Sequence, residues 1–288
     1  MQTDKISIRA KDGADITAVT RDLGEAIKGV VIISHGFGEH SGSYNELMEN
    51  LAGGGYGSVI LDQRGHGQLS ENPKKRNKLL GIVPKYKCFL DDIDSVSDYV
   101  KQEAPGKPIA LYGHSMGGNI VANYLLRLKT AKDDVSCAVL ESPWFGLYKD
   151  VSPLVSGMAK VLGGISSKIA IINKLSYDDI TGDKARATEI ENDPLYHNRI
   201  SMRLFSGIRK ACKYAVKKAS KLTVPTFLAY AGSDRIVSNK AIREFFGRSG
   251  PNVKIKEYDS CHAIHNDLQK GVFHQDMIDF LDRHCAVD

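Results

Sequence analysis

The sequence predicts an α/β fold, with a mostly parallel sheet, helices on both faces and an inserted helical cap. Short apolar runs alternate with segments of helical periodicity along most of the 288 residues, an order typical of a parallel sheet covered on both faces. Several polar, glycine-containing motifs directly follow these runs, at the strand ends where such sheets bind ligands. Residues 142–222 break the alternation, which predicts a cap between the core segments 1–141 and 223–288.

The core elements follow from apolar runs and turn residues. The chain opens with a predicted hairpin, residues 6–9 and 14–20, turned at Asp12-Gly13. A helix is predicted over 86–103, where apolar side chains recur at helical spacing. Further strands are predicted at 28–36, 56–67, 107–115, 135–143, 224–234 and 253–261, and further helices at 44–51 and 116–129.

Composition argues against several classes of protein. Hydrophobic residues make up 42% of the chain and charged residues 25%, as in ordinary soluble globular proteins. The first residues lack the apolar region of a signal peptide, and no run reaches the roughly 18 apolar residues of a membrane span. Five scattered cysteines have neither disulfide nor zinc spacing, which predicts reduced thiols in a cytoplasmic protein and no metal. Outside the basic segment described below, the sequence has no dense basic patch with interleaved aromatics, so no nucleic-acid partner is predicted.

The pentapeptide GHSMG, residues 113–117, fits the nucleophile-elbow pattern G-x-S-x-G. A predicted strand precedes Ser115 and a predicted helix follows it, which is the structural setting that this pattern needs. Gly113 and Gly117 would let strand and helix approach closely around a strained turn. The alternative is a glycine-rich turn whose serine is inert. In its setting, the motif predicts that Ser115 is a nucleophile.

An acid and a base follow the serine in the chain order that this arrangement requires. Asp234 ends the strand over 224–234, although an aspartate there could also form an Asx turn or cap a helix. Glu141, at the end of an earlier strand, is the competing acid. His262 is preferred as the base over His265 because it lies nearer the end of the last predicted strand. His265 is then expected to line the pocket.

The oxyanion hole is predicted to consist of two backbone amides. The residue after the nucleophile, Met116, supplies one, and the loop HGFGEH supplies the other, from Phe37. A phosphate-binding glycine loop is the alternative, but neither G-x-G-x-x-G nor a Walker lysine pattern follows this strand. Together these parts predict acyl transfer through an acyl-enzyme, with no cofactor.

The motifs HGFGEHSGSY, GHSMGG, NDPL, AGSDRIV and HAIHND resemble the monoacylglycerol lipase and lysophospholipase branch of the α/β-hydrolase superfamily, and they occur in its order over essentially the whole chain. The resemblance implies an α/β-hydrolase fold and a catalytic triad on the serine, aspartate and histidine chosen above. It also implies that Glu39 and His265 help to surround a glycerol headgroup. The chain departs from the pattern at Phe37, where a small residue is usual, and at Ser43, where arginine is usual.

The predicted cap is basic. Residues 142–222 carry a net charge of +7, whereas the rest of the chain carries −2. The segment 199–222 places Ile208, Cys212 and Ala215 at helical spacing among lysines that include Lys213 and Lys217. Such an amphipathic basic helix can make transient contact with an anionic membrane surface. The alternative is a helix that packs on the core and exposes its lysines.

The sequence as a whole predicts a cytoplasmic serine hydrolase of carboxylic esters whose basic cap can bring it to a membrane surface. Monoacyl lipids, either monoacylglycerols or lysophospholipids, are the leading substrate class. The alternatives within the fold are a short-chain carboxylesterase, a peptidase or an acyltransferase. A binding protein that kept the fold without the chemistry is disfavoured by the complete set of catalytic residue types.

Overall fold

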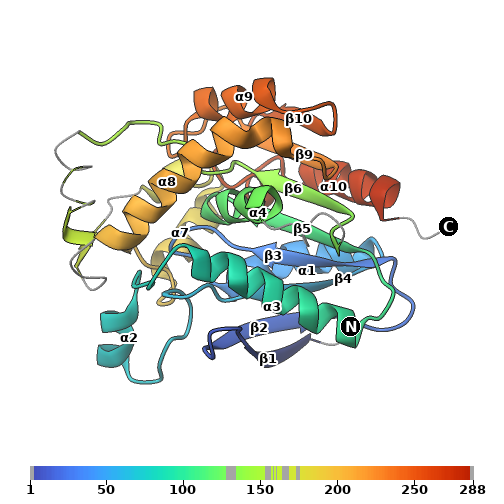
Figure 1. Ribbon diagram of the computed structural model, residues 1–288, viewed down its shortest axis with the longest axis horizontal. Coiled ribbons are helices and arrows are strands. Elements are labelled where there is room, and N and C mark those ends of the chain that lie inside the picture. Colours follow the sequence, from blue (N-terminus) through green and yellow to red (C-terminus); the bar gives the residue numbers. More distant parts are fainter. Residues whose placement is uncertain are drawn as a thin grey trace.

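A computed structural model describes residues 3–127, 134–152, 157, 159, 161–163, 169–172 and 176–285. Its main sheet has eight strands in the order β1-β2-β4-β3-β5-β6-β9-β10 (Figure 1). These are β1 (Thr3–Arg9), β2 (Asp15–Arg21), β3 (Gly29–Ser34), β4 (Tyr56–Leu61), β5 (Ile109–His114), β6 (Cys137–Glu141), β9 (Thr226–Ala231) and β10 (Val253–Tyr258). The helices are α1 (Asn45–Gly53), α2 (Pro73–Leu79), α3 (Lys87–Glu103), α4 (Met116–Arg127), α7 (Lys184–Asn192), α8 (Met202–Lys218), α9 (Asn239–Arg248) and α10 (Lys270–His284).

Six of the strands are parallel, and the hairpin β1–β2 joins them antiparallel at one edge. This arrangement confirms the predicted mostly parallel sheet and the opening hairpin. The carboxyl ends of β3, β5, β6, β9 and β10 therefore meet along one edge of the sheet. The loops that carry the predicted functional residues start from these ends, which brings distant parts of the chain together.

Helices cover both faces of the sheet, as predicted (Figure 1). Successive side chains of a strand point to opposite faces, so Val30 and Ile32 of β3 join one core and Val31 and Ile33 join the other. The first core takes its helical side chains from α3, α4, α8 and α9, and the second takes them from α1 and α10. Because both faces are buried, the central strands read as continuous apolar runs.

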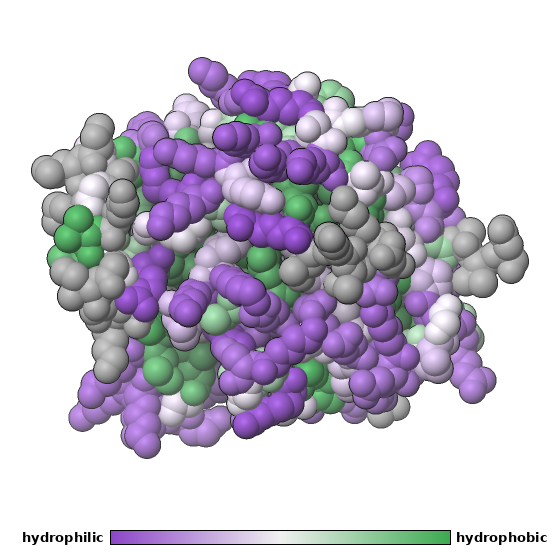
Figure 2. Space-filling model, viewed as in Figure 1, coloured by the Kyte–Doolittle hydropathy of each residue, from purple (hydrophilic) through white to green (hydrophobic). Residues whose placement is uncertain are grey.

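Helix α8 contains the basic segment that predicted a membrane-facing helix. Its apolar side is turned into the first core, where Ile208, Cys212 and Ala215 are buried against α4 and α9. Its opposite side exposes Lys210 and Lys213, and Figure 2 shows hydrophilic side chains over this part of the molecule. The helix thus packs on the core and exposes its lysines, which was the alternative to a membrane-facing helix. Only its charged side is available to contact a membrane surface.

The predicted cap also differs from expectation in its strands. A helical cap is predicted for residues 142–222, but β7 (Ala170–Ile172) pairs there antiparallel with β8 (Arg199–Ser201). Three-residue strands are too short to produce a recognisable alternation. Residues 153–156, 158, 160, 164–168 and 173–175 of the predicted cap lie outside the described residues. Within the described part of the chain, no helix is long and apolar enough to cross a membrane.

Candidate active site

Ser115 lies at a sharp turn between β5 and α4. Its backbone has φ +53°, a left-handed conformation that costs about 1–3 kcal/mol for a residue other than glycine. A Cβ on Gly113 would lie 2.5 Å from the Gly117 carbonyl oxygen, and one on Gly117 would lie 1.9 Å from the Ser34 carbonyl oxygen. Both glycines are therefore required by the close approach of strand and helix that the pentapeptide predicted.

Hydrogen bonds hold this turn in place. The Ser115 amide donates to the Glu141 carbonyl at 2.9 Å, and the Ser115 carbonyl accepts from the amides of Asn119 and Trp144 at 3.1 and 2.9 Å. The turn is thus tied to the end of β6 and to the loop that follows β6. These bonds offset the backbone strain and fix the direction in which the serine hydroxyl points.

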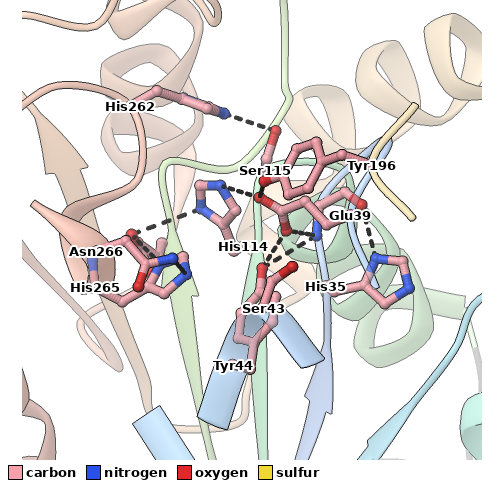
Figure 3. Close-up of polar contacts among 12 residues, drawn as sticks. His35, Glu39, Ser43, Tyr44, His114, Ser115, Tyr196, His262, His265 and Asn266 are labelled. Carbon is pink, nitrogen blue, oxygen red and sulfur yellow. Dashed lines mark hydrogen bonds and ion pairs between the residues drawn. The ribbon is translucent and has the colours of Figure 1, made fainter. Parts of the chain in front are cut away.

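The serine, histidine and aspartate predicted from chain order are in contact, and Figure 3 shows the contact between Ser115 and His262. The His262 Nε2 lies 2.8 Å from the Ser115 Oγ, and the His262 Nδ1 lies 2.7 Å from the Asp234 Oδ2. All three side chains are buried. With the Nδ1–H donating to the carboxylate, Nε2 is free to accept the serine hydroxyl proton.

Asp234 serves the loop after β9 as well as the histidine. Its Oδ1 accepts the amides of Ile236 and Val237 at 2.8 and 2.9 Å, while Oδ2 faces His262. The Asx-turn alternative therefore coexists with the histidine contact, whereas the cap of α9 is Ser238. Burial alone would lower the pKa of His262, but the adjacent Asp234 carboxylate and its hydrogen bond raise it above its ordinary value.

The two residues predicted to supply the oxyanion hole lie on neighbouring segments of the site. Phe37 follows β3 and Met116 begins α4, and both flank the nucleophile turn. Among the residues that the structure describes, no protein acceptor takes a hydrogen bond from either amide. The Phe37 ring makes edge contacts with Trp144 and His197, at centroid separations of 6.4 and 5.7 Å. These contacts form an aromatic wall beside the nucleophile.

A cavity of about 520 Å³ opens onto Ser115 and His262, within the usual range for small-molecule sites. Apolar and aromatic side chains make up about half of its lining, and the rest is polar or charged. The apolar lining includes Phe37, Trp144, Leu147, Ile200, Phe205 and Ile236. Such a lining suits an apolar substrate with one polar reacting group.

Glu39 lines this cavity, as expected for a substrate-binding residue, but most of its hydrogen-bonding capacity is occupied. Its Oε2 accepts the Gly36 amide at 2.6 Å and the Tyr44 hydroxyl, and its Oε1 accepts the Tyr196 hydroxyl at 2.9 Å. Burial opposes ionisation, but nearby imidazoles and the Tyr44 hydrogen bond hold the pKa of Glu39 at about 2. The carboxylate remains charged close to the nucleophile.

His265 does not line the cavity, and this part of the sequence prediction is corrected. Its Nδ1 and its amide lie 3.0 and 3.1 Å from the Glu141 Oε1, and its Nε2 lies 3.0 Å from the Asn266 side chain. Its ring stacks on Tyr44 at a centroid distance of 4.7 Å. In Figure 3, His114 lies between Ser115 and the His265–Asn266 pair. The loop after β10 turns back beneath the site, so only the first of its two histidines reaches the serine.

Glu141, the competing acid, belongs to the same group of contacts as His265. Its carboxylate accepts from the Tyr112 hydroxyl and from His265, and it lies 3.6 Å from the His114 Nδ1. The ligand atoms of His114, Glu141 and His265 lie within 4.8 Å of one another, a grouping that could hold a cation. Because Glu141 and His265 are hydrogen-bonded to each other, the grouping is explained by a hydrogen-bonded network.

Three further residues contact the acidic side chains of the site and were not predicted from the sequence: His114, Tyr44 and Tyr196. His114 occupies the variable position before the nucleophile, so the elbow pattern places it at the same strand end. Tyr196 follows the NDPL motif, which is more than 150 residues from its partner Glu39. No local periodicity could have predicted that contact.

Comparisons with known proteins agree with this architecture. Residues 25–269 match the family described as serine aminopeptidase, S33. The chain is 27% identical over 263 residues to a monoacylglycerol lipase of Mycolicibacterium smegmatis, covering 89% of each protein. It is 29% identical over 246 residues to an abhydrolase domain-containing protein of Dictyostelium discoideum, but spans only 25% of that protein's length.

A solved structure, the monoacylglycerol lipase of Paleococcus ferrophilus, superposes with a TM-score of 0.83 at 27% identity, covering 94% of this chain and 100% of that one. The human monoglyceride lipase is 28% identical over 257 residues, which cover 86% of this chain and 80% of that protein. The chain therefore belongs to the serine aminopeptidase S33 family of α/β-hydrolases, in the branch that resembles monoacylglycerol lipases.

Proposed function

We propose that this protein is a serine hydrolase that cleaves the carboxylic ester of a monoacyl lipid, with Ser115 as nucleophile, His262 as base and Asp234 as the acid that orients it. The observation that carries the proposal is the 2.8 Å contact between the Ser115 Oγ and the His262 Nε2 at the wall of a partly apolar cavity. The names of the relatives support the substrate class, because several are monoacylglycerol or monoglyceride lipases and one is a Bacillus subtilis phospholipase.

Acylation begins when the His262 Nε2 accepts the Ser115 proton and Oγ attacks the ester carbonyl carbon. The carbonyl electron pair moves onto oxygen, where the Phe37 and Met116 amides stabilise it; one such donor is worth about 3 kcal/mol in comparable sites. The imidazolium, held by Asp234, then donates its proton to the leaving alcohol. An acyl-enzyme remains.

Deacylation repeats these steps with water. His262 removes a proton from the water as its oxygen attacks the acyl carbon, and the proton then passes to the Ser115 Oγ as the carboxylic acid leaves. The two half-reactions balance without a metal or a cofactor. The apolar lining contributes by binding the acyl chain and limiting water at the acyl-enzyme.

The test is fluorophosphonate labelling combined with a panel of esters. Wild-type protein should be labelled and should hydrolyse monoacylglycerols, while Ser115→Ala should lose both properties and keep its fold. Ser233→Ala, a change at an exposed serine in the loop after β9, is the matched control and should behave as wild type. Folded wild-type protein that is not labelled would overturn the proposal. A sharp optimum for short p-nitrophenyl esters would favour a carboxylesterase instead.

We also propose that the exposed lysines of α8 contact anionic lipid surfaces from a cytoplasmic location. Lys210, Lys213 and Lys217 are exposed on one side of the helix, and the described cysteines are free thiols, as in reducing compartments. Binding would be electrostatic, since the apolar side of α8 is buried. Activity on anionic vesicles should fall with added salt and with K213E/K217E. Unchanged activity under both conditions would reject the contact.

A further inference from the structure

Two cationic side chains line the catalytic cavity, and neither has an anionic partner among the residues that the structure describes. Lys149 and Arg235 share this cavity with Ser115 and His262, and both side chains are exposed. Among the described residues, no carboxylate lies within ion-pair distance of either one. Lysine and arginine on a protein surface usually find a carboxylate or project into bulk water, so an unpaired pair on a cavity wall requires an explanation.

The backbone register brings the two cations together. The Ser238 amide donates to the Gly146 carbonyl at 3.0 Å, and the Tyr148 amide donates to the Ile236 carbonyl at 3.0 Å. Between these bonds, Leu147 forms an antiparallel bridge with Val237. The pair Tyr148–Ile236 follows in this register, and Lys149 and Arg235 lie one residue beyond it on their two segments. Two positive charges on adjoining segments of one cavity wall repel each other.

The nearest carboxylates in the sequence are committed elsewhere. Asp150, next to Lys149, is paired with Arg209 of α8. Asp234, next to Arg235, uses one oxygen for His262 and the other for the amides of the following turn. The repulsion between Lys149 and Arg235 is therefore not relieved by their neighbours in the chain.

Two other carboxylates line the cavity, and neither replaces the missing partner. Glu39 is buried and accepts three hydrogen bonds from its surroundings. Asp179, at the end of the short helix Tyr177–Asp179, approaches the site through its carbonyl, which accepts the His262 amide at 3.3 Å. Its carboxylate forms no ion pair with either cation within the described part of the chain. Asp179 sets a limit on how strongly the wall attracts an anion.

We propose that Lys149 and Arg235 form a binding site for the phosphate of a monoacyl phospholipid headgroup, so that the enzyme prefers anionic monoacyl esters over neutral monoacylglycerols. The inference rests on the proposed serine hydrolase function and adds the headgroup class. A guanidinium can bind two phosphate oxygens in a planar fork, and an ammonium adds a compact charge. Relief of the repulsion between the two cations adds to the attraction.

The site is placed to act on specificity and not on the bond-breaking step. Arg235 directly follows Asp234, so its position is fixed by the turn that holds the catalytic aspartate. A phosphate bound there would lie at the same cavity that holds the ester. The fatty-acid carboxylate released by hydrolysis has the same anionic chemistry, and the experiment must separate these two sources.

The experiment compares kcat/KM for 1-oleoylglycerol 3-phosphate and 1-oleoylglycerol in matched neutral-detergent micelles. Wild type should prefer the phosphate ester. The double variant K149Q/R235Q should lose about 10- to 100-fold on the phosphate ester, as expected for removing charge-assisted contacts, and should stay within about twofold on the neutral one. Asp179→Asn should increase the preference. The control K240Q/R248Q removes two exposed positive charges from α9 and should change neither rate by more than about twofold.

An equal loss on both esters, or a preference that survives K149Q/R235Q, would overturn the headgroup site. Inhibition supplies the second arm: glycerol 3-phosphate should inhibit wild type more than the double variant. If free oleate alone shows that difference, the site binds the product carboxylate and the headgroup assignment fails. Failure of the underlying function would look different, because wild type would then hydrolyse neither ester and fluorophosphonate would not label Ser115.

Discussion

Replacing Glu141 with glutamine tests how much one buried charge contributes to stability. Glu141 is fully buried at the end of β6, where it accepts from the Tyr112 hydroxyl and from the His265 amide and ring. Burial opposes ionisation, but His265, His114 and these hydrogen bonds lower the pKa of Glu141 from 4.5 to about 2. Glutamine has the same shape and cannot ionise.

The magnitude follows from the shift in pKa. A group whose pKa is depressed on folding stabilises the protein above its unfolded value, here 4.5, and loses that contribution as the pH falls through about 2. A shift of two to three units corresponds to about 3 kcal/mol at neutral pH. At about pH 3, roughly 2 kcal/mol of this contribution should already be lost. Glu141→Gln should therefore cost about 3 kcal/mol at neutral pH and much less near pH 3.

Urea unfolding followed by circular dichroism, at about pH 7, 5 and 3, measures this difference. Glu257→Gln is the matched control, because Glu257 also accepts a tyrosine hydroxyl, from Tyr230 on the neighbouring strand, but is exposed. The control should lose less than about 1 kcal/mol at every pH. If the gap between wild type and Glu141→Gln stays constant from about pH 5 to pH 3, it reflects a lost hydrogen bond and the charge argument is refuted.

Three further predictions concern the proposed chemistry. As the pH falls, kcat/KM should drop when His262 is protonated, with an apparent pKa above 6.5 because Asp234 stabilises the imidazolium. A pH–rate profile on a neutral ester measures this pKa, and an apparent pKa below 6.5 on the acid side contradicts the prediction. Asp234→Asn should lower kcat by about 10⁴-fold on that ester, and a loss below about 100-fold would contradict its role. Gly117→Ala puts a Cβ 1.9 Å from the Ser34 carbonyl oxygen, so it should cost about 1–3 kcal/mol in urea unfolding and reduce fluorophosphonate labelling. Gly247→Ala, which meets nothing within 4 Å, should show neither loss.

The parts of the fold that could be predicted from the sequence depend on local pattern. The strand β5, the turn at Ser115 and helix α4 follow one another within about twenty residues, and the glycine spacing together with this strand–turn–helix setting identifies the turn. Chain order and a position close after a strand then favour Asp234 and His262, because parallel strands deliver their loops to one edge. The strands and helices that carry these residues can be predicted without information about distant contacts.

The parts that could not be predicted depend on which surfaces meet. The periodicity of α8 shows an apolar side but not whether that side meets a membrane or, as found, α4 and α9. His265 was expected in the cavity because it lies three residues after His262, but the short helix Ile264–Asn266 turns it toward Glu141. The approach of the Lys149 segment to the Arg235 segment depends on the Leu147–Val237 bridge, which joins residues about ninety positions apart and has no signature in either segment.

Glu141 illustrates how a residue with a catalytic appearance acquires a different role. It has the residue type and strand-end position of a triad acid, yet it makes no hydrogen bond to His262. Its carbonyl accepts the Ser115 amide at 2.9 Å, and its carboxylate accepts the amide and ring of His265. One residue thus binds the nucleophile turn through its backbone and the loop of the base through its side chain. Because Ser115 and His262 must meet within 2.8 Å, this double link explains why a buried charge is retained where an apolar residue would pack at lower cost.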